Sequence, residues 1–356
     1  MRGTLHFLLL PVLWLGTGCT PWSTTVPPPQ KAAAALWRLQ ANDGGWHSTR
    51  YGLLKSGQSL TPFVLNTLLD APGEIPTSDV DRALAFLKSH TDKDGAVGRM
   101  DSTAEDYPNY ATALSVLAIY KAKRPGYQEQ AAPLAACLRR QQFAEDRGYR
   151  RDAPVYGGWG MGGDLHSAPH TGHVDLSMTR YVLQALSAAG TTAGDPAFER
   201  AQVFLGRCQN ADTDGGFFFS PVILDANKAG GEGSRFRSYG TTTADGLLAL
   251  LAAGVPASDT RVRAAAKWLR EHHSSTGAPG FVDQAHARWT GGLRFYYAAA
   301  GAQAGRRLGL PQDTGLAADL IKTQRPDGLW ANADSLVKED DPLIATPFAL
   351  AALLAK

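Results

Sequence analysis

The sequence is poor in cysteine, and its charges are nearly balanced. Three cysteines in 356 residues are too few for a disulfide-built scaffold, and a chain of this length can bury a sizeable core without one. The apolar run from Leu5 to Leu15 is too short to cross a bilayer as a stable helix. The formal net charge is only +2, with both signs spread along the chain. These shortages predict a globular protein that does not bind nucleic acid.

Residues 1–19 are typical of an export signal, with Arg2, the apolar run, and then small residues that end in Cys19. A cysteine in this place resembles the lipobox of bacterial lipoproteins, in which it is acylated and becomes the mature N-terminus. Here Gly16 fills the slot of the usual leucine. The resemblance implies a membrane-anchored lipoprotein on the periplasmic or cell-surface side. Residues 20–30, rich in Pro and Thr, would form a tether to a domain over residues 31–356. An ordinary cleaved signal peptide is the alternative.

Acylation of Cys19 would leave Cys137 and Cys208. They could pair in an oxidising compartment, or stay as buried thiols inside predicted helices.

A unit of 49 to 64 residues recurs six times. Each copy has an amphipathic segment, a Gly-containing turn, and then an aromatic or apolar anchor residue. The anchors are Trp46, Val97, Trp159, Phe217, Phe281 and Trp330. This spacing predicts one helical hairpin per unit.

A second helix is predicted after five of the anchors, from a threonine with aliphatic residues four and seven places later. The threonines are Thr61, Thr112, Thr179, Thr243 and Thr346. Each stands near the start of its helix, where its hydroxyl can act as a cap. The fifth unit lacks the threonine and has Tyr296 and Tyr297 in the corresponding region.

Six hairpins without a convincing β-strand predict an all-α fold. The second helices are rich in Ala and Leu, as expected for inner helices covered on both sides, and the first helices carry the charges of an outer layer. An open solenoid is the alternative, but this pattern favours closure into an α6/α6 barrel, the α/α toroid. The long loops before the inner helices would then meet at one mouth.

The units resemble the Gln-Trp repeats of squalene-hopene cyclases and the related repeats of protein prenyltransferase β subunits. The clearest copies run from Lys31 to Trp46, from Arg200 to Phe217 and from Ile321 to Trp330, with Gln40, Gln209 and Gln324. The resemblance covers nearly all of residues 31–356 and implies the toroid fold. It implies less about activity, because related toroids include cyclases, prenyltransferases and thioester domains of complement-like proteins.

The signature of each activity is altered or missing. Class II cyclases begin an inner helix with Asp-x-Asp-Asp-Thr, whose middle Asp protonates an alkene. Placing that threonine on Thr179 keeps Asp175 and puts Ser177 at the acid, where a hydroxyl is too weak for the step. Neither Cys137 nor Cys208 follows an Asp by two places, as prenyltransferase zinc sites require, and the Gly-Cys-Gly-Glu-Gln thioester motif does not occur.

Several polar residues near the predicted mouth are candidates for chemistry. Asp175, Asp340 and Asp341, at the starts of inner helices, are candidate acids or simple helix caps. Candidate ligand-binding residues are Arg237, for an anionic group, and Tyr239, Tyr296 and Tyr297, for a cavity wall that stabilises a carbocation.

The stretch GGDLHSAPHTGHVDLSMT precedes the third inner helix. His166, His170 and His173, with Asp164 or Asp175, offer enough ligands for zinc, which could activate water. A polar rim loop without metal is the alternative.

The resemblance implies that a central cavity binds an isoprenoid or other lipid-like ligand. The catalytic motifs are degenerate, and the N-terminal anchor would hold the protein at a membrane. A non-catalytic toroid that binds a lipid or a protein at its mouth is the competing hypothesis. A metal-dependent hydrolase built on the histidines is the third.

Overall fold

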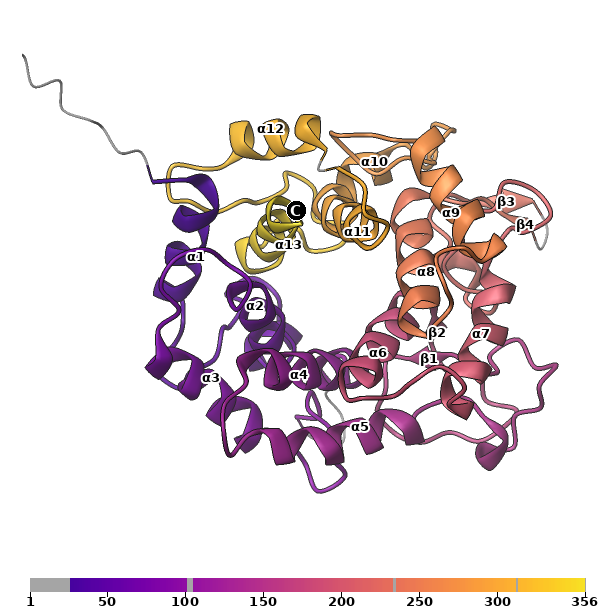
Figure 1. The fold of residues 1–356 in the computed structure, drawn as a ribbon, viewed down its shortest axis with the longest axis horizontal. Helices are drawn as coiled ribbons and strands as arrows, with labels where there is room; N and C mark the ends of the chain where they lie inside the picture. Colours follow the sequence, from indigo (N-terminus) through magenta and orange to yellow (C-terminus); the bar gives the residue numbers. More distant parts are fainter. Residues whose placement is uncertain (1–25, 101–104, 233–234, 312, 356) are drawn as a thin grey trace, which may run out of the picture.

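Six helical hairpins form a closed ring of inner and outer helices (Figure 1). The computed structural model describes residues 26–100, 105–232, 235–311 and 313–355. The inner helices are α2 (Leu60–Leu68), α4 (Pro108–Ala122), α6 (Leu176–Ala188), α8 (Gly240–Ala252), α11 (Arg294–Arg307) and α13 (Pro342–Leu354). The outer helices are α1 (Pro28–Arg38), α3 (Thr77–Ser89), α5 (Ala131–Arg140), α7 (Pro196–Cys208), α9 (Thr260–Glu271) and α12 (Thr314–Thr323). The predicted all-α toroid of six hairpins is confirmed.

The loops at the mouth hold most of the remaining short elements. Helix α10 (Arg288–Gly292) and three 3-10 turns (Leu53–Ser56, Glu145–Arg147 and Leu224–Ala226) lie between an outer helix and the inner helix that follows it, whereas a fourth 3-10 turn (Gln128–Gln130) links α4 to α5 at the opposite end. Strand β1 (Trp159–Gly160) pairs antiparallel with β2 (Val174–Asp175), and β3 (Gly231–Glu232) pairs likewise with β4 (Arg235–Phe236). Because Trp159 lies opposite Asp175 in the first pair, the start of α6 is fixed against the third anchor.

In the units that have it, the glutamine of the repeat joins its hairpin to the next one. Gln40 and Gln209 donate from Nε2 to a carbonyl in the first turn of the next outer helix, each at 2.9 Å. Gln324, in the last unit, makes the same bond to the carbonyl of Pro28 at the start of α1. Helix α13 also packs against both α1 and α2. The ring is therefore closed by the same interaction that builds it.

The repeated threonines do not cap their own helices, contrary to the sequence prediction. Each Oγ1 instead accepts the backbone N–H of the preceding anchor, as Thr243 does from Phe217 at 3.1 Å. The side-chain caps of α6 and α13 are Asp175 and Asp341. The reason is that the anchor N–H is buried and needs a partner, which the hydroxyl in the first turn of the adjacent helix provides.

Replacing Thr243 with valine tests this bond with little change of volume. The buried Phe217 N–H would lose its partner, and we expect the free energy of unfolding to fall by about 1 to 3 kcal/mol. Thr213→Val, at an exposed turn, is the matched control and should change it by less than about 0.5 kcal/mol. Urea denaturation measures both, and equal effects of the two substitutions would contradict the assignment.

A glycine precedes the anchor because the turn leaves no room for a side chain. Gly157 has φ +87°, and a Cβ there would lie 1.9 Å from the carbonyl oxygen of Arg200 on the next outer helix. Gly44 makes the same approach to Arg82, at 2.4 Å. These glycines let each anchor turn pack directly on the neighbouring unit.

Within the described ranges, every helix is too short or too polar to span a bilayer. Cys137 and Cys208 are both buried free thiols. The predicted signal, lipobox cysteine Cys19 and most of the tether lie outside the described residues.

Candidate active site

A cavity of about 290 Å³ lies at the mouth where the inner helices begin. Its wall is formed by five inner helices, α2, α4, α6, α11 and α13, by the loops before them and by the loop before α8. Most of the lining residues are apolar or aromatic. The non-aromatic polar residues among them are Ser59, Asp175, Ser177, Lys228 and Lys338.

Five aromatic rings, one from each of these helices, form the inner part of the wall. The Phe348 ring centroid lies 4.8 Å from that of Phe63 and 5.1 Å from that of Tyr296. The rings of Tyr110 and Tyr181 meet edge to face at 4.8 Å. Tyr296 is thus placed where the sequence predicted a cavity wall. Together the ring faces can stabilise a positive charge that develops inside the cavity.

Asp175 brings a carboxyl group to this wall and is only 3% exposed. Its Oδ1 accepts the N–H of Met178 at 2.7 Å, and its Oδ2 lies 3.9 Å from Nε2 of His173. Burial raises the pKa of Asp175 from 3.8 to about 7, against the opposing effect of the Met178 N–H. A large share of the Asp175 side chains therefore keeps a proton at neutral pH, as a general acid must.

On α8, a carboxylate stands where three other inner helices have an aromatic ring. Asp245 stands two residues after Thr243, as Phe63, Tyr181 and Phe348 stand after their own threonines. This carboxylate is fully buried.

Asp245 accepts three hydrogen bonds. They come from Arg180 Nη1 at 2.7 Å, Ser177 Oγ at 2.6 Å and the Tyr296 hydroxyl at 2.6 Å. The Ser177 hydroxyl, at the position of the cyclase acid, therefore donates its hydrogen bond to Asp245. The network orients the Tyr296 ring in the cavity wall.

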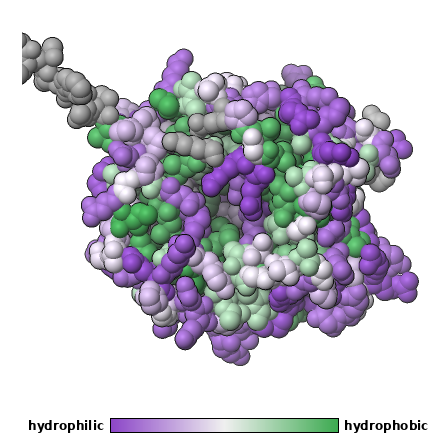
Figure 2. Space-filling model, viewed as in Figure 1, coloured by the Kyte–Doolittle hydropathy of each residue, from purple (hydrophilic) through white to green (hydrophobic). Residues whose placement is uncertain are grey.

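A second cavity, of about 160 Å³, lies on the other side of the aromatic rings. It shares Phe63, Tyr181, Tyr296 and Phe348 with the central cavity. Its other lining is more polar and includes Asn66, Lys121, Arg180, Gln184, Gln303 and Arg306. Figure 2 shows the ring hollowed at its middle, with hydrophilic residues at the border of the hollow. The aromatic rings thus separate an apolar chamber from a polar one.

The acidic run before α13 binds neighbouring groups and does not line the central cavity. Oδ2 of Asp340 lies 2.8 Å from Nη2 of Arg50, and its Oδ1 accepts the hydroxyl of Tyr51. Asp341 caps α13 by accepting the N–H of Leu343 at 2.9 Å. Of the three predicted acids, the structure brings Asp175 alone to the cavity wall.

The remaining ligand-binding candidates lie away from the central cavity. Tyr239 and Tyr297 pack in a separate buried apolar cluster beside Leu293. Adjacent residues on a helix point about 100° apart, so Tyr296 faces the cavity and Tyr297 faces outward. Nη1 of Arg237 lies 2.7 Å from Oδ2 of Asp283.

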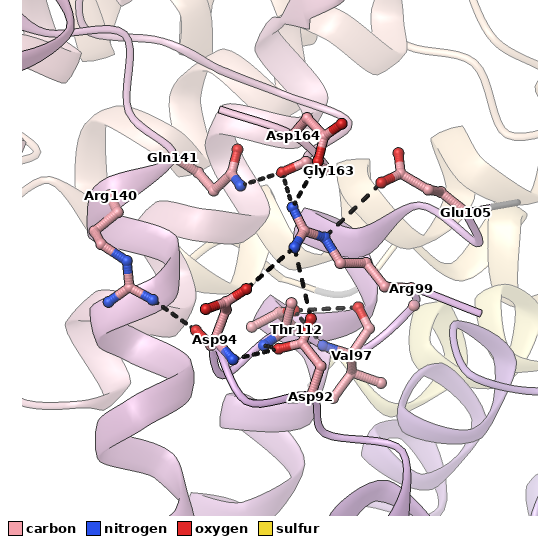
Figure 3. Close-up of polar contacts among 12 residues, drawn as sticks. Asp92, Asp94, Val97, Arg99, Glu105, Thr112, Arg140, Gln141, Gly163 and Asp164 are labelled. Atoms are coloured by element: carbon pink, nitrogen blue, oxygen red, sulfur yellow. Dashed lines mark hydrogen bonds and ion pairs between the residues drawn. The ribbon is translucent and has the colours of Figure 1, made fainter. Parts of the chain in front are cut away.

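The loop that carries the histidines is tied to the second unit by Arg99 (Figure 3). Its guanidinium donates to the carbonyl of Gly163. It also lies 3.6 to 3.8 Å from four carboxylates, those of Asp92, Asp94, Glu105 and Asp164. Burial raises the pKa of Glu105, and Arg99 opposes that rise. These contacts hold the loop on the rim of the mouth.

The three histidines do not converge on one point. The rings of His166 and His170 stack at 4.0 Å, whereas His173 turns toward Asp175. In the described part of the chain, no group of three or more His, Cys, Asp or Glu side chains is placed to hold a metal ion.

Sequence reasoning did not single out Arg180, Tyr181 or Lys228. The sequence does contain a sign that Arg180 and Asp245 are functional, since each is a charged residue within an apolar inner helix. The sequence contains no such sign for Lys228, because this residue lies in a loop without a motif and reaches the cavity only through tertiary packing.

No protein-family model and no curated protein matches the sequence, but solved structures match the fold. Type II terpene cyclase MstE from Scytonema aligns with a TM-score of 0.57 at 14% identity, over 92% of this chain and 96% of that one. An MstE variant in complex with its substrate, geranylgeranyl dihydroxybenzoate, gives 0.57 at 16% identity over the same shares. A protein from Actinoplanes gives 0.55 at 18% identity, over 92% and 97%.

The fold is that of the type II terpene cyclases. The toroid fold implied by the repeats is therefore confirmed. At 14 to 18% identity the likeness establishes the architecture. It does not establish the chemistry.

Proposed function

We propose that this protein binds an isoprenoid chain in its central cavity and catalyses its cyclisation, with Asp175 as the proton donor. The observation that supports this most is a buried carboxyl group, with a pKa raised to about 7, on a wall of aromatic rings. The structural neighbours support the substrate class. One MstE variant was solved with geranylgeranyl dihydroxybenzoate as substrate and another with merosterolic acid A as product.

The proposed reaction adds one proton to the substrate and later removes a different one. The Asp175 carboxyl proton adds to one carbon of an alkene, which leaves a carbocation on the other carbon and a carboxylate on the enzyme. A second alkene of the same chain attacks the cation and closes a ring, while the faces of Tyr181, Tyr296 and Phe348 stabilise the charge. Loss of a proton from the final cation gives an isomer of the substrate. The apolar wall limits the water that could capture the cation.

Non-catalytic binding of the same kind of ligand is the alternative. It is favoured by Ser177, which stands where the cyclase motif has its acid and which donates to Asp245. In that case the cavity would bind an isoprenoid or lipid without changing it. A protein partner could then bind at the mouth only when the ligand is present.

Incubation in D₂O distinguishes the two functions. The protein is given geranylgeranyl dihydroxybenzoate, geranylgeraniol or geranylgeranoic acid, and the extract is analysed by mass spectrometry. Cyclisation begun by protonation gives an isomer that carries one deuterium from the solvent. Binding of these probes without any deuterated isomer would contradict cyclisation and support the non-catalytic alternative.

We also propose that acylation of Cys19 anchors the toroid at the outer side of a bacterial membrane, close to a supply of apolar ligands. The support is the sequence before residue 20. Mass spectrometry of the mature N-terminus tests it, and a mature chain that begins at another residue without lipid would contradict it.

A further inference from the structure

Two lysines face the apolar central cavity from different parts of the mouth. Lys228 lies in the loop before α8, and its Nζ is 4.4 Å from the ring centroid of Phe219 and 5.4 Å from that of Trp289. Lys338 lies in the loop before α13, with its Nζ 5.8 Å from the ring centroid of Tyr51. The first lysine thus contacts the fourth and fifth units, and the second contacts the first.

Neither lysine forms an ion pair within 4.0 Å among the described residues. The Lys228 Nζ has a long hydrogen bond, 3.5 Å, to the carbonyl of Ala226. The Lys338 Nζ lies 3.3 Å from the hydroxyl of Tyr107. Burial lowers the pKa of Lys228, and the charge of Asp175 partly offsets this effect. A half-buried ammonium group without a carboxylate in contact is unfavourable, and an anion would relieve that.

The carboxyl groups of Asp175 and Asp340 do not fully neutralise the two lysines. Asp175 supplies at most one negative charge against the two lysines, and its pKa, raised by burial to about 7, leaves part of it uncharged at neutral pH. Asp340 is already bound by Arg50 at 2.8 Å and by Tyr51. The inner helices also begin at this mouth, and their N-terminal ends add positive potential. The cavity therefore has a surplus of positive charge.

The backbone at Lys338 is held in a conformation that lysine rarely adopts. Its φ is +64°, in the left-handed region that disfavours residues with a Cβ. The surrounding turn fixes it, because Lys338 N–H donates to Ser335 and its carbonyl accepts the N–H of Asp341. Such strain is retained where neighbouring structure enforces it, often at ligand sites.

We propose that the ligand of the central cavity carries an anionic group, a carboxylate or a phosphate, which Lys228 and Lys338 bind while the apolar chain lies against the aromatic rings. This inference rests on the proposed function and specifies its substrate class. It assigns the lysines a binding role at the polar end of the ligand and leaves the protonation to Asp175.

Binding of matched prenyl compounds tests the proposal. The probes are geranylgeranoic acid, geranylgeranyl monophosphate and the methyl ester of the acid, measured by calorimetry with the full chain at pH 7.5. We expect at least one of the two anions to bind about tenfold more tightly than the ester, because charge-assisted bonds to a buried ammonium are strong. The stronger of the two anions identifies the head group. Equal affinity of all three compounds would overturn the proposal.

Substitution of each lysine tests whether it is the source of the preference for the anion over the ester. Lys228→Met and Lys338→Met should each remove most of the preference for the anion while the affinity for the ester stays the same. Lys228→Arg should retain it, which keeps the test valid if the methionine variant fails to fold. Lys267→Met, at an exposed lysine paired with Glu271, is the matched control. A preference that survives both methionine substitutions would also overturn the proposal.

The outcomes distinguish a failure of the anionic head group from a failure of the isoprenoid-binding cavity. Binding of the ester and the anions with equal affinity would contradict the anionic head group but agree with an isoprenoid cavity. Failure of all three compounds to bind would contradict both.

Discussion

Replacing Asp175 with asparagine is expected to reduce cyclisation by about two to four orders of magnitude, the usual contribution of a general acid. The variant should still fold, because an asparagine carbonyl can accept the Met178 N–H that the carboxylate accepts at 2.7 Å. It should also still bind the prenyl chain, because the aromatic wall is unchanged. The deuterium-labelled product is measured for wild type and variant under saturating ligand.

Asp313→Asn is the matched control for this change. Asp313 caps outer helix α12 through the same bond three residues ahead, to the N–H of Leu316 at 3.0 Å, and lies outside the central cavity. It should leave product formation within about twofold of wild type. Wild-type turnover in Asp175→Asn would show that the proton comes from another group.

The same variant should change how stability depends on pH. The pKa of Asp175 is about 7 in the folded protein and near 3.8 in the unfolded chain, so the folded state holds the proton more tightly between these values. The stability from this group is complete below about pH 4 and is lost as pH rises to about 7. At roughly 1.4 kcal/mol per pKa unit, the loss is on the order of 4 kcal/mol. Relative to wild type, Asp175→Asn should therefore gain stability across this range, as measured by urea denaturation at pH 4, 5, 6 and 7.

The second large effect is expected at the buried ion pair of Arg180 and Asp245. Their side chains are 5% and 0% exposed and lie 2.7 Å apart. Arg180→Met would leave the Asp245 carboxylate without its cation in a dry interior, and we expect the free energy of unfolding to fall by about 3 to 5 kcal/mol. Urea denaturation at neutral pH measures the loss.

The double variant Arg180→Met/Asp245→Leu provides the internal check. Removing both charges should restore much of the stability, because the single variant suffers mainly from the unpaired charge. The exposed pair of Arg139 and Asp195 is the control, and Arg139→Met should cost less than about 1 kcal/mol. A similarly small loss in Arg180→Met would mean that Asp245 does not depend on its partner for burial.

The architecture was predictable because the repeat encodes it locally. Each anchor, its glycine and the following threonine meet within one unit, so their spacing identifies the hairpin without knowledge of the rest of the chain. The expected role of threonine was wrong, because the sequence does not reveal that the anchor N–H would be buried beside it. Ring closure followed from the apolar inner helices, and the bond of Gln324 to Pro28 joins the two ends.

The cavity wall was harder to predict because it depends on which way each side chain points. Tyr296 and Tyr297 are adjacent, and the fifth unit has no threonine to set the register, so the sequence could not say which of them faces inward. Lys228 comes from a loop whose path is set by tertiary contacts. Asp175 was found because a known motif could be aligned on Thr179, whereas Asp245 reaches the same region from another helix.

Mass spectrometry of ligand held by the protein tests the central cavity most directly. Wild type is incubated with geranylgeranoic acid and desalted beside Met161→Trp, which fills the cavity, and Ala302→Trp, which fills an outer groove beside α11. We predict that wild type and Ala302→Trp retain the prenyl compound and that Met161→Trp loses it. Equal retention by wild type and Met161→Trp, or loss only in Ala302→Trp, would contradict an isoprenoid site at the centre of the ring.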